Sequence, residues 1–465
     1  MPELSEYPEN KPQALIDLAQ GEYNDRAAAM AQAWRYYRGD MKRPLKVRQN
    51  QPDDNVIFKL CGKMIAQAVA LLFRKTPAFQ LDDNADKSPV ETVLDELWTA
   101  NRKATFLNNL ATNGALSGHC YVKLLPTNDM LRPVRFVALK PEQVSVFWAP
   151  DDLEKVTAYV VYWKAGETEY REDHINRGAS WDILNMTRKG GGEWTVTNEA
   201  SWPFGWAQIV DWQNLPDPQG YYGTWDLDNP QLNDALNFVA SNTQRIIRYH
   251  AHPRTIGTGF RSGDVQDTSV DAFFTIANPD AKVQNLEMQS DLTASMGFMQ
   301  QLQAQFWSEH RGVDLTSIKD RLGQLTNFGL RVLFGDAMDK LGTKRELYGM
   351  GLQHINRRAL ELLGYGADNL TQIVWADVLP SSGLETTQTQ QMRLDMGIQS
   401  KQTTAMALGL DWEQEQARMD DEKAGDTDIG TMLLGAFERG QTQLQRGQMQ
   451  EGENGNGRQQ PIPNA

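Results

Sequence analysis

Few residues of this 465-residue chain could do chemistry, and they are scattered. His250 and His252 form the pair HAH, which would offer two nitrogen ligands to a metal ion, but no nearby cluster of cysteine, histidine or carboxylate residues completes a site. Cys61 and Cys120, the only cysteines, lack the spacing of metal ligands or of a disulfide framework. We therefore expect no metal centre and no cofactor, and we expect both cysteines to be small buried side chains.

Motifs that bind nucleotides or activate a nucleophile are also missing. The chain has no G-x-x-x-x-G-K-[ST] phosphate loop and no G-x-S-x-G nucleophile turn. The glycines of GTGFRSG at 257–263 follow a predicted helix rather than a strand, and their spacing differs from the dinucleotide-binding pattern. Acidic residues are plentiful, but nothing singles out a two-metal nuclease site. These patterns predict that the chain is not an enzyme.

Lys319 and Arg321 are the candidates for contact with phosphate. They lie in GVDLTSIKDRLGQLTN, residues 312–327, which connects two long predicted helices. Such a segment is either a solvated connector or a loop that projects into a channel and presents cations to DNA. The chain carries 46 Lys and Arg against 60 Asp and Glu, a formal net charge of −14. Because tight DNA binding usually needs a basic face, we expect any contact with DNA to be loose.

Two predicted helices, 230–252 and 291–311, precede this loop, and the second leads directly into it. Apolar residues recur in them at spacings of three and four, as Leu232, Leu236, Val239 and Ile246 in the first and Leu292, Met296, Met299 and Phe306 in the second. The remaining positions of the second helix are mostly uncharged. The pattern fits two ordinary core helices, or two helices flanked by copies of themselves around a ring, since neutral faces suit helix–helix contact better than charged ones.

A very long helix is predicted over 327–363, and it contains three glycines at seven-residue spacing. They are Gly335, Gly342 and Gly349. Each costs roughly 1 kcal/mol relative to alanine inside a helix. Seven-residue spacing places them on nearly one face, where a neighbouring backbone could approach closely. The alternatives are chance or a bend near Gly342.

The rest of the chain predicts helices and antiparallel strands, and hence an α+β fold of two to four domains. Helical spacing covers about 22–38, 56–74, the segment before Gly118 and a pair within 385–423. Between 120 and 200, short β-branched and aromatic runs separated by Pro, Gly and Asp are typical of an antiparallel meander, with a hairpin loop at 188–194. The Gln- and Gly-rich tail from about 440 predicts disorder.

Membrane and secretion signals are not evident. The longest apolar run, residues 68–73, is far shorter than the roughly 18–20 residues that span a bilayer. The N-terminus has neither the basic start nor the apolar stretch of a secretion signal. We expect no membrane partner and a product made in the cytoplasm of a host cell.

The order of these segments resembles the portal proteins of tailed bacteriophages, the head-to-tail connectors. The resemblance extends over roughly 25–425. It is carried by WRYYRGD at 34–40, NGALSGHCYVKLLP at 113–126, the run from LPDPQGYYG to RTIGTG at 215–259, NPDAKVQNLEM at 278–288, LGQLTNFGLRVLF at 322–334, and the run from DMGIQ to ARMDDE at 395–422.

This resemblance implies a ring of identical subunits, usually twelve, and a division of the chain into portal domains. The implied domains are a wing at 1–229 made of a helical N-terminus and the β meander, stem helices at 230–252 and 289–311 with a clip at 253–288 between them, a tunnel loop at 312–327, a wing long helix and helical pair at 328–425, and a crown or disordered tail at 426–465. In this mapping Lys319 and Arg321 face DNA.

The resemblance also implies the partners and the location. The ring would occupy one capsid vertex of the virion and pass double-stranded DNA during packaging and ejection. It would bind the large terminase subunit, a head–tail adaptor, and the major capsid and scaffolding proteins. The sequence leaves two alternatives open, a monomeric minor head or scaffold protein and, less favoured, a nucleic-acid-processing enzyme.

Overall fold

The computed structural model divides the chain into two compact units, residues 1–379 and 380–465. The described residues are 26–47, 49, 52–81, 88–227, 229–251, 254–258, 280, 282–286, 292–316, 327–378, 390–398, 400, 404, 415–416 and 418–419. Most of the second unit lies outside these residues, including most of the predicted helical pair and all of the predicted crown. In the first unit the described elements are helices and antiparallel strands, which confirms the α+β class.

Four helices precede the two main sheets in the first unit. They are a helix at 26–38, α2 (Leu60–Phe73), α3 (Pro89–Ala100) and α4 (Lys103–Ser117). Local sequence sets their ends. Ser88 and Glu91 form a reciprocal capping box at the start of α3, while Gly39 and Gly118 take the left-handed conformation after the first helix and α4, with φ of 79° and 82°. The predicted turn at Gly118 is confirmed.

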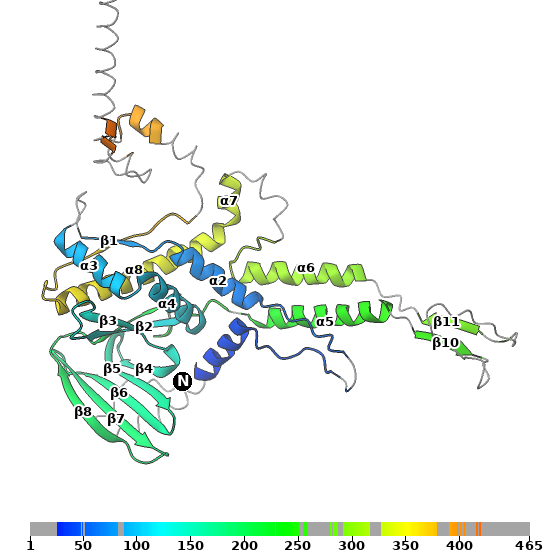
Figure 1. Cartoon of the computed structure of the whole chain (residues 1–465), viewed down its shortest axis with the longest axis horizontal. Helices are drawn as coiled ribbons and strands as arrows, with labels where there is room; N and C mark the ends of the chain where they lie inside the picture. The colour runs from blue at the N-terminus through cyan, green and yellow to red at the C-terminus, as the bar shows by residue number, and fades with distance from the viewer. Residues whose placement is uncertain are drawn as a thin grey trace, which may run out of the picture. The chain divides into compact units, whose positions relative to one another are not determined.

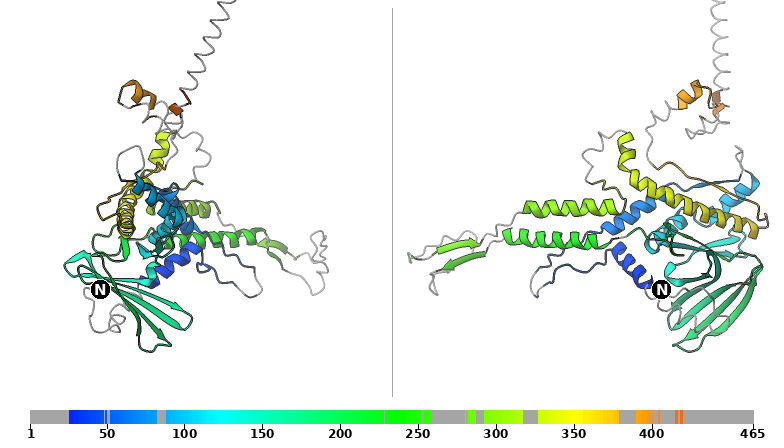
Figure 2. Two further views of the ribbon diagram at one scale, coloured as in Figure 1. Left: turned by 60° about the vertical axis from the view of Figure 1, so that its left-hand side comes forward. Right: turned by 180° about the vertical axis from the view of Figure 1, so that it is seen from behind.

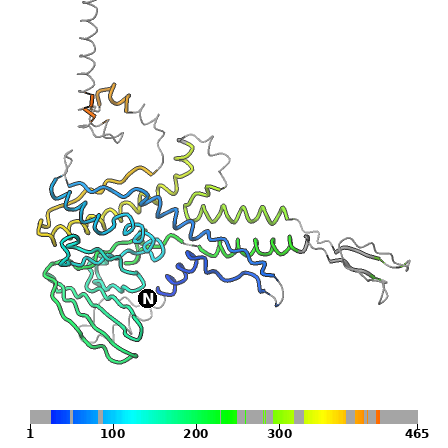
Figure 3. Tube along the Cα trace, in the orientation of Figure 1, coloured from blue at the N-terminus to red at the C-terminus, as the bar shows by residue number. Residues whose placement is uncertain are grey.

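Two antiparallel sheets of three and five strands form most of the β part of the described residues (Figures 1 and 3). The larger sheet has the strand order β4-β5-β6-β7-β8 and the smaller has β3-β2-β9. The strands are β2 (His119–Pro126), β3 (Val134–Ala138), β4 (Val144–Ala149), β5 (Asp152–Ala165), β6 (Thr168–Asn176), β7 (Trp181–Lys189), β8 (Thr195–Trp202) and β9 (Ile209–Gln213). Neighbours in the larger sheet are consecutive in sequence, so the predicted meander is confirmed there, as is the hairpin loop between β7 and β8.

Two long helices run side by side away from the sheets, as Figures 1 and 2 show. They are α5 (Gln231–Ala251) and α6 (Leu292–Glu309). Two short strands, β10 (Arg254–Thr258) and β11 (Lys282–Leu286), pair antiparallel beyond their ends. Residues 259–279, which include the strand-like run FFTIA, lie outside the described residues.

The predicted helix over 327–363 is two helices rather than one. α7 (Asn327–Leu333) and α8 (Gly335–Leu362) are separated at Phe334, where the backbone leaves helical geometry. The break comes eight residues before Gly342, where the sequence suggested a bend. Beyond α8, the short strand β12 (Gln372–Val374) pairs with β1 (Ala78–Gln80).

The main hydrophobic core lies between α2, α3, α4, α8 and the smaller sheet, and a second cluster fills the space between the two sheets. Cys61 and Cys120 are fully buried in the main core, as expected for small apolar side chains. Trp98 is the largest fully buried side chain, and its indole N–H donates a 2.7 Å hydrogen bond to Asn356 of α8. These contacts hold α8 against α3 and the smaller sheet.

Candidate subunit-contact surface on the long helices

One face of α5 binds an extended segment of its own chain through a row of polar side chains. Ser241 accepts a hydrogen bond from the backbone N–H of Val56 at 2.9 Å, and Asn237 accepts one from Phe58 at 2.8 Å. Asn233 accepts another from Leu60 at 3.0 Å. Four helical residues rise about 6.0 Å and two extended residues span about 6.6 Å, so Ser241 and Asn237 keep in step with Val56 and Phe58, whereas Leu60 is already the first residue of α2. We call this contact the α5 ladder.

An ion-pair cluster continues the ladder by one more step. Asp54 lies two residues before Val56, and its carboxylate lies 3.2 Å from Arg245 Nε and 2.7 Å from an Arg248 guanidinium nitrogen. Near the other end of α5, the Tyr36 hydroxyl donates a 2.5 Å hydrogen bond to Asp234. Burial and this carboxylate raise the pKa of Tyr36 to about 12. The polar residues that break the apolar stripe of α5 therefore have partners within the chain.

α6 has a different surface. It packs beside α5 along one side, and near its end Phe306 and Trp307 enter the main core. From Leu292 to Ser308 it carries no charged residue, and Met296 and Phe298 are 57% and 50% exposed. Water-facing helices usually carry charged residues on the exposed face. The exposed side of α6 therefore has the composition of a surface that another protein covers.

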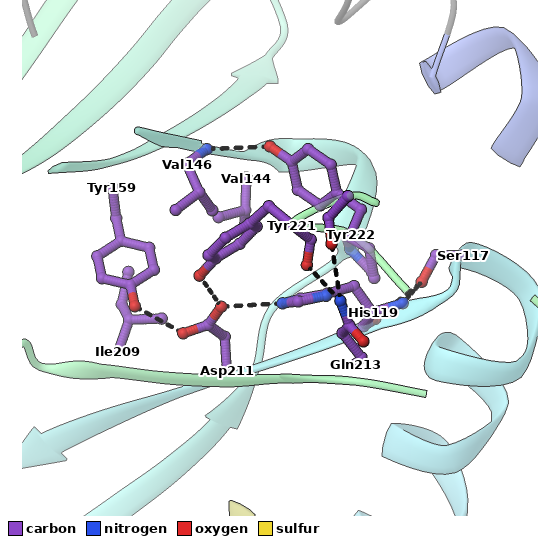
Figure 4. Close-up of polar contacts among 12 residues, drawn as sticks. Ser117, His119, Val144, Val146, Tyr159, Ile209, Asp211, Gln213, Tyr221 and Tyr222 are labelled. Carbon is purple, nitrogen blue, oxygen red and sulfur yellow. Dashed lines mark hydrogen bonds and ion pairs between the residues drawn. The ribbon is translucent and has the colours of Figure 1, made fainter. Parts of the chain in front are cut away.

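A buried carboxylate joins the two sheets, as Figure 4 shows. Asp211 of β9 accepts hydrogen bonds from Tyr159 of β5 at 2.6 Å and from Tyr221, and it pairs with His119 of β2 at 2.9 Å. Burial acts to raise the pKa of Asp211, but the hydrogen bonds from His119, Tyr159 and Tyr221 outweigh it and hold the pKa below its usual value. These hydrogen bonds link β2 and β9 of the smaller sheet to β5 of the larger sheet.

Two further sets of buried ion pairs hold the fold. Asp226 lies 3.0 Å from Lys340 and 2.5 Å from Lys344, both on α8. Burial would raise the pKa of Asp226, but the two lysines outweigh it and lower that pKa. In the larger sheet Glu172 of β6 pairs with Lys123 and, at 2.6 Å, with His174. No group of three or more potential ligands for a metal ion occurs among the described residues.

Residues 18–428 match the model of a family described as "Phage portal protein, SPP1 Gp6-like". The chain belongs to this portal family. No curated protein sequence shows significant similarity to the chain. A bilayer-spanning helix is not found in the described part of this portal protein.

Solved structures of phage-like particles are similar to this portal protein at low sequence identity. One described as "Neck of empty GTA particle computed with C6 symmetry" is 13% identical with a TM-score of 0.45, and the match covers 76% of this chain and 90% of that one. The structure described as "Virion of native gene transfer agent (GTA) particle" is 12% identical with a TM-score of 0.44, and the match covers 84% of this chain and 99% of that one. The structure described as "Neck of native GTA particle computed with C12 symmetry" is 12% identical with a TM-score of 0.43, and the match covers 88% of this chain and 96% of that one.

The predicted contact residues of the portal protein's long helices fall into two groups. Leu236 and Phe306 are only 3% and 1% exposed, because their own chain already covers them. The other six keep exposed surface, with Met296 the most open, and they are Leu232, Val239, Ile246, Leu292, Met296 and Met299. Contact with a second copy stays a prediction for these six. The sequence did not single out Phe298, whose exposure strengthens the same surface.

The three glycines of α8 differ in their surroundings. A Cβ added at Gly335 or Gly342 would meet no atom within 4 Å, and one added at Gly349 would lie 3.9 Å from Trp375. The closest approach of another element is at Gly351, where an added Cβ would collide with the indole of Trp212. Close packing of Gly335 and Gly342 against another chain stays a prediction.

Lys319 and Arg321 lie outside the described residues, as does the predicted tunnel loop beyond residue 316. The start of this segment is held by the core. Val313 exchanges hydrogen bonds with the side chain of Gln67, which donates to the Val313 carbonyl at 3.0 Å and accepts from its N–H at 3.1 Å. The contact of the two cations with DNA therefore stays a prediction.

Proposed function

We propose that this portal-family chain assembles into a ring of about twelve copies that forms the DNA conduit at one vertex of a phage capsid. Helices α5 and α6 form the stem, and the region of β10 and β11 forms the clip. The two sheets, the N-terminal helices and α8 form the wing. The segment at 312–327 forms the tunnel loop, and the residues after 425 a small crown.

The observation that carries the proposal is the surface of α6. The exposed, uncharged face of α6 is wide, because Met296 and Phe298 lie about 160° apart around the helix axis, and covering such a face is favourable whereas its contact with water is not. The α5 ladder and the α5–α6 contact leave that face outside the fold of one chain. Membership of the portal family is the second support, and together they favour a ring over a monomeric head protein.

The charge of the chain suits a conduit that passes DNA without holding it. Each copy carries a formal charge of −14, so a ring of copies is strongly acidic. An acidic wall repels phosphate within a Debye length of about 8–10 Å. Lys319 and Arg321 then supply sparse cationic contacts, repeated once in each subunit.

The ring acts in the virion and, before that, in the host cytoplasm during assembly. It nucleates the head with the capsid and scaffolding proteins, and it binds the large terminase subunit during packaging. It later docks the head–tail adaptor and releases DNA during ejection. The chain itself performs no chemistry, because ATP hydrolysis belongs to the terminase.

Measuring the mass of the purified protein tests the proposal. One chain has a mass of 52.5 kDa, so light scattering at micromolar concentration and physiological salt separates rings from monomers. Axial views by electron microscopy then show whether a pore is present. Only monomers under these conditions, or closed particles without a pore, would overturn the ring.

A pair of variants tests the role of α6. Replacing Met296 and Phe298 together by glutamate is expected to abolish rings, because it places charges on both flanks of the uncharged surface of α6 in every copy. Met130→Glu is the matched control, since Met130 is 95% exposed but lies in the β2–β3 loop. Rings that form normally with both α6 charges would remove α6 from the contact.

A further inference from the structure

The helix at 26–38 has a buried face and an exposed basic face. Met30, Ala33 and Tyr36 are buried, and the hydrogen bond from Tyr36 to Asp234 fixes the rotation of the helix about its axis. Along the exposed face, from the N-terminal end of the helix, lie two alanines, one glutamine and two arginines. They are Ala28, Ala31, Gln32, Arg35 and Arg38. Arg35 and Arg38 form no ion pair with a described residue, although the Arg38 guanidinium lies over the Trp34 ring at 5.2 Å.

α8 has an exposed face of the opposite charge. Its other face is fixed in the core by Leu341, Tyr348 and Leu352 and by the Asp226–Lys344 ion pair. The exposed face carries Asp336, Asp339, Gly342 and Glu346. None of these three carboxylates has an ion-pair partner among the described residues. The two lysines of the same helix segment are buried on the opposite side with Asp226.

The two faces match residue by residue when the helices run antiparallel. Arg38 then lies opposite Asp336, Arg35 opposite Asp339, Gln32 opposite Gly342, and Ala28 opposite Glu346. The steps are three, three and four residues on both helices, so the pairs stay in register at 1.5 Å per residue. Gly342 has open space above it, and the small alanines leave room for an axis separation of about 8–10 Å.

One chain cannot make this contact with itself. Figures 1 and 2 show the helix at 26–38 and α8 apart from each other within the first unit, and both are held there by core residues. Two different complementary faces on one rigid unit produce a head-to-tail contact between copies. Such a heterologous contact closes into a ring when its rotation allows, whereas identical faces would give a two-fold dimer.

We propose that the exposed face of the helix at 26–38 in one copy packs antiparallel on the exposed face of α8 in the next copy, with the ion pairs Arg38–Asp336 and Arg35–Asp339. This inference rests on the proposed ring and names two of its contact surfaces. In this contact Gly342 lets the neighbouring helix approach closely, whereas within the single chain no atom lies near enough to require a glycine there.

Charge exchange tests the contact. Arg35→Glu with Arg38→Glu, and separately Asp336→Arg with Asp339→Arg, are each expected to shift most of the protein from rings to lower-mass species at 0.1 M salt. The four changes combined restore the attraction and should return most of the ring fraction. All four positions are exposed, so thermal unfolding of every variant should match the natural chain.

The outcomes separate this contact from the ring itself. If the natural chain forms rings and both reversed pairs also form them normally, the ring stands and this contact is wrong. If each reversed pair breaks the ring and the combination fails to restore it, the pairing is wrong. Restoration by the combination alone supports it.

Disulfide trapping gives an independent measurement. A chain with Arg38→Cys is mixed with a chain carrying Asp336→Cys, and mild oxidation is expected to give a covalent dimer. The natural cysteines are fully buried and should not react. Arg135→Cys in place of Arg38→Cys is the matched exposed control. Equal dimer yields with the control would overturn the contact.

Discussion

The side-chain oxygen of Asn237 accepts a 2.8 Å hydrogen bond from the backbone N–H of Phe58, 179 residues earlier in the chain. The same helix face repeats this contact one turn away on each side, at Asn233 and Ser241. A helix that shows no wide apolar face therefore still has a partner within its own chain. The partner is a row of backbone N–H groups, at Val56, Phe58 and Leu60. These groups need hydrogen-bond acceptors rather than apolar surface.

We predict that Asn237→Ala lowers the free energy of unfolding by about 1–3 kcal/mol, because it leaves a partly buried backbone N–H without an acceptor. Urea denaturation at fixed protein concentration measures the change. Gln244→Ala on the exposed side of the same helix is the control and is expected to change the value by less than about 0.5 kcal/mol. Equal losses for both would mean that the α5 ladder contributes no stability.

Asp226→Asn is expected to cost about 3–5 kcal/mol, because it leaves Lys340 and Lys344 buried without a negative charge. Asp151→Asn, at an exposed aspartate between β4 and β5, is the control. Chemical denaturation of both variants measures the difference. A loss below about 1 kcal/mol for Asp226→Asn would show that the lysines find water or another acceptor.

The pH dependence of stability should reflect Glu172. Burial would raise the pKa of Glu172, but the hydrogen bond from His174 and the charge of Lys123 outweigh it and lower the pKa to about 2. A carboxylate with a lowered folded-state pKa contributes stability above its usual pKa and loses it as the pH falls toward 2. The contribution is up to about 3 kcal/mol, at 1.36 kcal/mol for each pH unit between the two values.

Comparison with Glu172→Gln isolates this contribution. The natural chain should lose more free energy of unfolding than the variant between about pH 4.5 and pH 2, measured by urea denaturation at several pH values. Parallel curves for the two proteins would assign the acid sensitivity to other carboxylates.

Gly351→Ala is expected to destabilise the protein by about 1–3 kcal/mol, because its Cβ would collide with the buried indole of Trp212. Gly342→Ala is the matched comparison in the same helix. It meets no atom within 4 Å, and alanine is the better helix former by about 1 kcal/mol, so the single chain should become slightly more stable. Thermal unfolding of the two variants should therefore move in opposite directions.

Lys319→Glu combined with Arg321→Glu tests the predicted tunnel loop. We expect rings of unchanged mass and a reduced amount of packaged or retained DNA, since the change replaces attraction to phosphate by repulsion. A DNA packaging assay with reconstituted heads measures the effect. Unchanged packaging would remove these two residues from the tunnel.

The sequence by itself determined the features that depend on neighbouring residues. Helical spacing and the glycine at Gly118 predicted where α4 passes into β2, and short β-branched runs predicted most strands of the meander. The absence of charge in α6 was readable without coordinates and led to the proposed ring. The order of segments was enough to indicate the portal family, which the family match over 18–428 confirms.

The tertiary structure alone decided which polar residues are structural. The charged residues of β6 do not resemble the β-branched and aromatic runs that predicted the meander, yet Arg171 and Asp173 pair at 2.6 Å in the sheet and are buried. The apolar spacing predicted that Leu236 and Phe306 contact a second copy of the chain, yet residues of their own chain bury them. Burial and ion pairing depend on residues that are distant in the sequence. A local pattern records that a side chain is polar or apolar, but it does not record which surface that side chain meets.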